Sequence, residues 1–216
     1  MNDAHVSFPG DGCLSVAFDR VIDPAINARC VALAGALERT RRAGIRDIVP
    51  GFHTVVVYFD PLTISREALT SDVERAMADR VPPAAEDDQP LEIPVRYGGD
   101  GGPDLGAVAA FGRCSEDDVI RMHTGAIYRV YMLGFLPGFA YLGPVVPRIA
   151  MPRLDSPRVA VAAGSVGIAG GQTGIYPCET PGGCRIIGRT DVRMFDPALA
   201  NPSLLRPGQR VEFIAA

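Results

Sequence analysis

Aromatic residues interleaved with glycine mark the first segment that could recognise a ligand. Between Tyr131 and Gly143, four aromatic residues stand among three glycines and a proline. Rings held between such backbone-permissive residues can form a rigid apolar wall beside a turn of the chain. A core strand followed by a wide loop also explains the composition, and aromatic stripes more often belong to a core. We take Phe135, Pro137 and Phe139 as the candidate binding residues of this segment.

A second segment, from Ala163 to Pro177, combines dense glycine with polar side chains. Five of its glycines fall within eleven residues. Because glycine in regular structure costs about 0.5–1 kcal/mol relative to alanine, this density predicts that the backbone approaches either the oxygens of a ligand or another strand. Gln172, Thr173 and Tyr176 add an amide, a hydroxyl and a phenol, which suit a carboxylate or amide ligand. We therefore expect the two segments to line one pocket.

Charged side chains outside these segments have simpler alternatives. Arg189 could hold a carboxylate or carboxyphosphate through two parallel hydrogen bonds, although an arginine more often forms a surface ion pair. His123 could act as a general base, but a lone histidine that ends a helix more often interacts with the helix dipole. Asp117 and Asp118 are interpreted as the charges of a helix N-terminus. Arg189 is kept as a candidate binding residue, and catalytic residues stay unassigned.

Several familiar chemistries lack their sequence signals. The chain has no glycine-rich dinucleotide or phosphate-binding motif, no GxSxG elbow and no lysine. The three histidines lie far apart and the five cysteines form no CxxC pair, so we expect reduced thiols and no metal site. A net charge of −4 and an isoelectric point near 5.4 exclude the strong basic field that attracts nucleic acid or anionic lipid.

No targeting or membrane segment is recognisable. The first ten residues include no apolar run of signal-peptide type. No stretch approaches the roughly 18 apolar residues that a spanning helix needs. The cytoplasm is therefore the expected location.

The first half of the sequence alternates strands and helices. Aspartate and proline at the start of one helix, and serine at the start of the other, are N-terminal capping signals. The order is strand, helix, strand, strand, helix, strand, as in the ferredoxin-like split βαβ arrangement. The last of these strands could instead belong to the second domain. An acidic, proline-flanked linker at 84–90 separates a domain of residues 1–90 from one of residues 91–216. The expected strands cover 14–18, 45–49, 54–59 and 91–95, and the expected helices cover 23–39 and 65–77.

The second half of the sequence has a different pattern of apolar residues. Asp104 is expected to cap a short helix that ends near Phe111, and Ser115 with Asp118 resembles a capping box for the next. Short apolar runs bounded by glycine and proline then predict a compact β-barrel. These runs cover 127–135, 159–162, 166–169, 184–187 and 210–214. The predicted fold class is thus α+β, with a small α/β domain followed by a barrel.

The two glycine-rich segments resemble the family of the 5-oxoprolinase B subunit, also described as allophanate hydrolase subunit 1 or KipI and as carboxyltransferase subdomain C and D. The strings that carry the resemblance are GFLPGFAYLG from Gly134, GSVGIAGGQTGIYP from Gly164, PGG from Pro181, IGRT from Ile187 and LRPGQ from Leu205. Weaker matches in the first half are IDPAINA from Ile22 and VPGF from Val49. The resemblance covers most of the chain. It implies an N-terminal α/β domain and a cyclophilin-like β-barrel.

The same resemblance implies a function that needs partners. Such a chain would work with a sister cyclophilin-like protein, the 5-oxoprolinase C subunit, and with an A subunit of LamB/YcsF type. The complex would use ATP to open 5-oxo-L-proline to L-glutamate, with no cofactor bound by this chain alone. We expect the isolated chain to be inactive, and to bind its sister subunit or to self-associate.

Two other functions share these motifs. One is a regulatory protein that inhibits a sensor histidine kinase. The other is an allophanate hydrolase or urea carboxylase component, for which a chain without lysine would need a separate biotin carrier.

The sequence departs from the family at Cys184, where relatives usually carry tryptophan. If the tryptophan ring belongs to a ligand wall, the pocket of this chain is wider. If the tryptophan ring fills the barrel, a neighbouring side chain of this protein should be larger than in the relatives.

Overall fold

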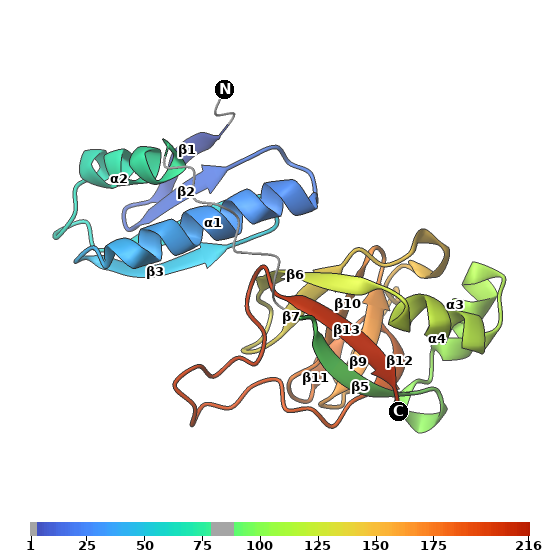
Figure 1. The fold of residues 1–216 in the computed structure, drawn as a ribbon. Helices are drawn as coiled ribbons and strands as arrows, with labels where there is room; N and C mark the ends of the chain where they lie inside the picture. Colours follow the sequence, from blue (N-terminus) through green and yellow to red (C-terminus); the bar gives the residue numbers. More distant parts are fainter. Residues whose placement is uncertain (1–3, 79–88) are drawn as a thin grey trace. The chain divides into compact units, whose positions relative to one another are not determined.

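The computed structural model describes residues 4–78 and 89–216, which form two compact units (Figure 1). Most of the predicted linker, residues 84–88, lies outside the described residues. Within the described part, no helix is long and apolar enough to cross a membrane.

The N-terminal unit is a four-stranded antiparallel sheet with two helices, in the strand order β1-β2-β4-β3. Because β2 and β3 both pair with β4, they run parallel to each other and enclose it, which is the predicted split βαβ arrangement. The edge strand β1 was not predicted, and the strand at 91–95 belongs to the barrel, which is the alternative placement given for it. The strands are β1 (His5–Gly10), β2 (Cys13–Ala17), β3 (Ile45–Pro50) and β4 (Thr54–Phe59).

Local signals set the ends of both helices of this unit. In α1 (Pro24–Thr40), the Asp23 carboxylate accepts hydrogen bonds from two backbone amides of the first turn, at 2.8 and 3.0 Å. The helix ends where Arg41 adopts a left-handed conformation. In α2 (Arg66–Ala78), the Ser65 hydroxyl accepts from the backbone N–H of Ala68. These capping interactions confirm the helix starts predicted from the sequence.

The C-terminal unit is a closed barrel with the strand order β10-β7-β6-β13-β5-β12-β9. Its first strand, β5, closes the barrel by pairing in parallel with the last strand, β13, and antiparallel with β12. The barrel confirms the predicted α+β class. Its strands are β5 (Leu91–Tyr97), β6 (Ile127–Leu133), β7 (Ala140–Gly143), β9 (Ser165–Ala169), β10 (Gln172–Ile175), β12 (Arg185–Arg189) and β13 (Arg210–Ala215). A separate ribbon is formed by β8 (Arg158–Val161) and β11 (Thr180–Gly182).

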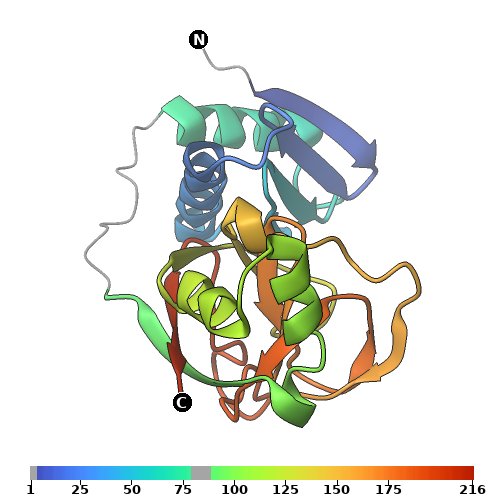
Figure 2. The same cartoon turned by 90° about the vertical axis from the view of Figure 1, so that its right-hand side faces the viewer.

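Two short helices pack side by side against the barrel, with α3 (Leu105–Gly112) on β12 and α4 (Glu116–Thr124) on β13 (Figure 2). Single 3-10 turns follow β5 and β7, at η1 (Gly99–Gly101) and η2 (Pro147–Ile149). The capping box of α4 is present: the Ser115 hydroxyl accepts from the Asp118 amide, and the Asp118 carboxylate accepts from the Ser115 amide.

Asp104 stands at the start of α3 as predicted, but it does not cap the helix with its side chain. Its buried carboxylate accepts instead from the backbone N–H of Ile186 on β12, at 2.6 Å, and from the Arg158 guanidinium on β8, at 2.8 Å. The side chain therefore joins α3, the barrel wall and the β8–β11 ribbon.

Replacing Asp104 with asparagine should destabilise the barrel by about 2–3 kcal/mol, because the change weakens two charge-assisted hydrogen bonds in a buried site. Asp191→Asn is the matched control. It breaks an Asp–Arg pair whose side chains are 74% and 58% exposed, and should cost less than about 1 kcal/mol. Urea unfolding followed by tyrosine fluorescence reports on the barrel, which holds every tyrosine except Tyr58. Equal costs for the two variants would contradict a structural role for Asp104.

Candidate functional site

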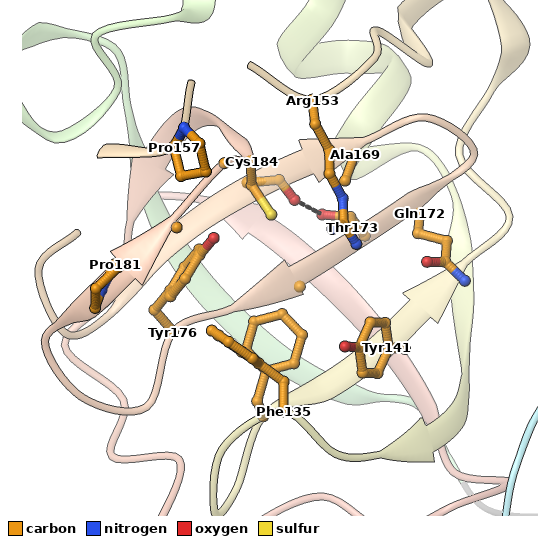
Figure 3. Close-up of a pocket in the computed structure, with 15 residues that line it drawn as sticks. Phe135, Tyr141, Arg153, Pro157, Ala169, Gln172, Thr173, Tyr176, Pro181 and Cys184 are labelled. Carbon is orange, nitrogen blue, oxygen red and sulfur yellow. Dashed lines mark hydrogen bonds between the residues drawn. The ribbon is translucent and has the colours of Figure 1, made fainter. Parts of the chain in front are cut away.

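A cavity opens on the barrel beside the β8–β11 ribbon (Figure 3). Its volume of about 260 Å³ is smaller than that of most sites for drug-sized ligands, so it suits a small molecule. The lining residues come from the 134–139 loop, from strands β7, β9 and β10, and from the loops on either side of the ribbon. They are Phe135, Phe139, Tyr141, Arg153, Pro157, Gly167, Ala169, Gln172, Thr173, Gly174, Tyr176, Pro181, Gly182, Gly183 and Cys184.

Aromatic rings in edge-to-face contact form one wall. The centroids of Phe139 and Tyr176 are 5.4 Å apart, and Phe135 lies 5.5 Å from Phe139 and 6.5 Å from Tyr176. Phe139 and Tyr176 are buried, whereas Phe135 is 58% exposed at the mouth. Phe135 also has a φ of +68°, a conformation that costs a bulky residue energy and that clusters at functional sites.

The turn that presents these rings depends on glycine. The backbone N–H of Gly134 donates to the Phe139 carbonyl, and that of Phe139 donates to the Leu136 carbonyl. Gly138 has a φ of +83°, and a Cβ atom there would lie 2.7 Å from the Cβ of Phe195. Both the conformation and the lack of space therefore require glycine at this position.

The polar groups of the cavity are Gln172, Arg153 and several hydroxyl or thiol groups. The Gln172 Nε2 atom is buried and has no hydrogen-bond partner. Burial raises the pKa of the Tyr176 phenol and of the Cys184 thiol, so both stay protonated near neutral pH. Neither group is therefore prepared to act as an anionic nucleophile.

Thr173 joins the cavity to a buried chain of hydrogen bonds. Its hydroxyl donates to the Gly167 carbonyl, at 3.0 Å, so the Nε2–H of His123 must donate to the Thr173 oxygen, also at 3.0 Å. The other ring nitrogen, Nδ1, then accepts from the Tyr97 hydroxyl at 2.7 Å. The three contacts together fix one neutral tautomer of His123.

Neither sequence interpretation of His123 holds. The residue lies in the last turn of α4, but its ring is fully buried and stacks on Phe213 with a centroid distance of 4.5 Å. Burial lowers the pKa of His123 to about 3, so the ring carries no charge to offer the helix dipole. With both nitrogens already bonded, it is a satisfied core residue and not an available base.

The structure brings together five of the seven predicted binding residues: Phe135, Phe139, Gln172, Thr173 and Tyr176. Pro137 belongs to the same turn but is exposed and does not line the cavity. Arg189 lies elsewhere: its Nε donates to the Ala163 carbonyl, and it lines a separate hollow with Arg96. Placing Arg189 in this pocket was therefore wrong, since β12 carries its side chain away from these loops.

Packing between neighbouring parts of the protein accounts for the central glycines. A Cβ atom on Gly174 would lie 2.9 Å from both the Ala140 carbonyl and the Phe139 ring, and one on Gly167 would lie 2.7 Å from the Cβ of Cys184. Of the two predicted explanations, close approach to another strand therefore applies to these positions. A ligand is not needed to explain them.

Sequence reasoning missed Arg153, because its segment has no periodicity and no motif. It also left the role of Cys184 open. Cys184 lines the cavity beside the Tyr176 phenol, with which its thiol interacts, so the small side chain leaves space in the cavity itself. Among the described residues, no group of three or more histidine, cysteine, aspartate or glutamate side chains is placed to hold a metal ion, and all five cysteines are free thiols.

The fold of this chain is shared with part of a larger protein of known structure. Urea amidolyase of Kluyveromyces lactis shares the architecture with a TM-score of 0.74, over 99% of this chain and 15% of that chain; at 22% identity the likeness concerns the fold. The chain belongs to the family described as carboxyltransferase domain, subdomain C and D, whose pattern matches residues 4–205.

Two closer relatives refine this assignment. The chain is 41% identical to the 5-oxoprolinase B subunit of Bacillus subtilis (strain 168) over 215 residues, covering 95% of this chain and 90% of the relative. The solved structure of TTHA0988 has a TM-score of 0.84 at 38% identity and covers 94% of this chain. This chain spans only 39% of TTHA0988.

Proposed function

We propose that this protein is the B subunit of an ATP-dependent 5-oxoprolinase, which opens the cyclic amide of 5-oxo-L-proline to L-glutamate. The observation that carries the proposal is the likeness to the 5-oxoprolinase B subunit along nearly the whole chain. Its partners would be the second cyclophilin-like protein, the C subunit, and an A subunit of LamB/YcsF type. Five free thiols favour a reducing compartment, the cytoplasm.

The chemistry explains why several subunits would be needed. A lactam carbonyl is a stabilised amide, and transfer of the γ-phosphoryl group of ATP to its oxygen makes the carbon open to attack by water. Water then adds to this carbon, and the ring C–N bond breaks with protonation of the nitrogen, which gives γ-glutamyl phosphate. A second water hydrolyses this acyl phosphate to glutamate and inorganic phosphate. The present chain has no lysine and no phosphate-binding loop, so nucleotide binding would lie with a partner.

The cavity offers this reaction a place to hold the substrate away from bulk water. Its aromatic wall is apolar, and its polar groups are hydrogen-bond donors that suit carbonyl or carboxylate oxygens. None of its lining groups is an anionic nucleophile or a free base, which supports a role in binding and orientation. On this proposal the attacking water would be activated by a group that a partner supplies.

The test is an ATP-dependent glutamate-release assay on the chain alone, on the two partner proteins alone and on the reconstituted mixture. Turnover is expected only in the complete mixture, because each part lacks groups that the reaction needs. Allophanate in place of 5-oxoproline serves as the substrate control. Glutamate release by the isolated chain, or a complete mixture that hydrolyses only allophanate, would refute the proposal.

A further inference from the structure

The geometry of the cavity points to a specific ligand class: we propose that it binds a small carboxylate, with Arg153 pairing with the carboxyl group and Gln172 donating to a second, carbonyl oxygen. The inference rests on the proposed function in one respect, which is the choice of 5-oxoproline as the carboxylate. The class of ligand follows from the cavity alone. No described acidic residue lines the cavity, and Arg153 is the one charged side chain among its lining residues.

Among the described residues, no carboxylate pairs with the charge of Arg153, which leaves it for an anion. The ion pairs of the described residues do not include it, although many of the other arginines have an aspartate partner. Burial raises the pKa values of Tyr176 and Cys184, and the positive charge of Arg153 opposes both increases, which places the guanidinium group near the cavity interior. Figure 3 shows this side chain directed inward from one rim, on the side opposite Phe135.

The backbone on both sides of Arg153 is held in place. The N–H of Leu154 donates to the Gly183 carbonyl at 2.8 Å, and Arg185 Nε donates to the Pro152 carbonyl at 3.0 Å. One residue further, the Met151 carbonyl accepts from the N–H of Gly170 at 2.8 Å. Residues 151–154 are thus hydrogen-bonded to two sides of the cavity. A ligand that binds Arg153 therefore loses little free energy in ordering this part of the backbone.

Gln172 supplies the second contact. A buried N–H group without a partner costs free energy, roughly 1–3 kcal/mol, which a ligand oxygen would recover. The Nε2 atom of Gln172 is such a group, and its side chain lines the same cavity as Arg153. Thr173 cannot take this role as a donor, because its only proton is already given to Gly167. A carbonyl oxygen of the ligand is therefore the complement of Gln172.

The rest of the cavity limits what joins the two oxygens. Phe135, Phe139 and Tyr176 offer edges and faces of rings, which suit a compact apolar body. The volume leaves room for a small ring or a short chain. A lactam carboxylic acid has these three parts: a carboxylate, a carbonyl oxygen and a saturated ring between them.

The experiment measures binding to the full isolated chain by calorimetry and by NMR chemical-shift changes. The probes are 5-oxo-L-proline, 2-pyrrolidinone, which lacks the carboxylate, and L-proline, which lacks the carbonyl oxygen. Only 5-oxo-L-proline should bind well. Arg153→Gln should weaken its binding about ten- to one-hundred-fold, the effect of losing a charge-assisted contact. Arg153→Lys should fall between, since it keeps the charge but not the two-pronged geometry.

Arg189→Gln is the matched control, because it removes an exposed arginine that lines a different hollow. It should bind 5-oxo-L-proline like the wild type. Gln172→Leu should weaken 5-oxo-L-proline more than it weakens a simple carboxylate such as cyclopentanecarboxylate. Circular dichroism verifies that each variant is folded. The Arg153 variants are expected to fold because the residue is exposed.

The inference and the proposed function fail separately. Absence of binding, or equal binding by Arg153→Gln and the wild type, would overturn the inference even if the reconstituted complex releases glutamate. Arg153-dependent binding to the chain would support the inference even if the complex has no activity. The inactivity of the complex would then count against the proposed function alone.

Discussion

Acidification from pH 7 to pH 5 is expected to cost the wild-type barrel about 2 kcal/mol of stability that a His123→Gln variant does not lose. The pKa of His123 is about 3 in the folded protein and about 6.5 in an unfolded chain. Between these values the unfolded chain binds a proton that the folded barrel excludes. Stability therefore falls as the pH drops below the unfolded pKa, with a limiting slope of about 1.4 kcal/mol per pH unit.

The difference between the two proteins isolates this residue, because every other titrating group is common to both. Stability is measured by hydrogen exchange of the β6 amides, which report on opening of the barrel alone. The variant should be less stable at every pH, since Tyr97 and Thr173 lose a bonding partner. If the variant proves too unstable, the ring resonances of wild-type His123 decide: a titration with a midpoint near pH 6.5 would show that the residue is accessible, contrary to the structure.

The sequence predicted those parts of the fold that depend on neighbours along the chain. Asp23, Ser65 and the Ser115–Asp118 box all act within one helical turn, and each caps its helix as expected. Strand runs rich in β-branched residues, such as 54–59, were also located correctly. The aromatic turn at 134–139 was identified because glycine and proline signal such a turn directly.

Long-range pairing explains most of what was missed. The edge strand β1 has no run of β-branched residues to indicate it. Strand β10 has only four residues, one of them glycine, so it was not recognised as a strand. Asp104 has the sequence position of a helix cap, but a backbone amide 82 residues away takes its carboxylate. Local patterns carry no information on which distant group will compete for a side chain.

The choice of arginine shows the same limit within the site. Arg189 stands in a recognisable string of residues, whereas Arg153 stands in a segment without pattern. Only the closed barrel reveals that the 151–154 segment bridges two rims of the cavity while the end of β12 faces another hollow. An arginine could be expected from the chemistry of a carboxylate ligand, but its position could not.

Gly138→Ala is expected to destabilise the barrel by about 2–5 kcal/mol and to displace the aromatic wall. The left-handed backbone alone costs an alanine about 1–2 kcal/mol, and overpacking in a filled site adds about 1–3 kcal/mol. The overlap would involve the Cβ of Phe195 at 2.7 Å and the Met194 carbonyl at 3.0 Å, neither of which is the end of a flexible side chain. Binding of the cavity ligand should weaken with it, because Phe135 and Phe139 flank this residue.

Gly170→Ala separates the two contributions. Gly170 also has a positive φ, of +60°, but no heavy atom lies within 4 Å of the position that its Cβ would take. Its substitution should therefore cost only the conformational part, about 1–2 kcal/mol. Hydrogen exchange of the barrel amides gives both values under the same conditions. A Gly138→Ala variant no less stable than Gly170→Ala would mean that the 134–139 turn can move away from Phe195, and that this turn is not the rigid wall of the site.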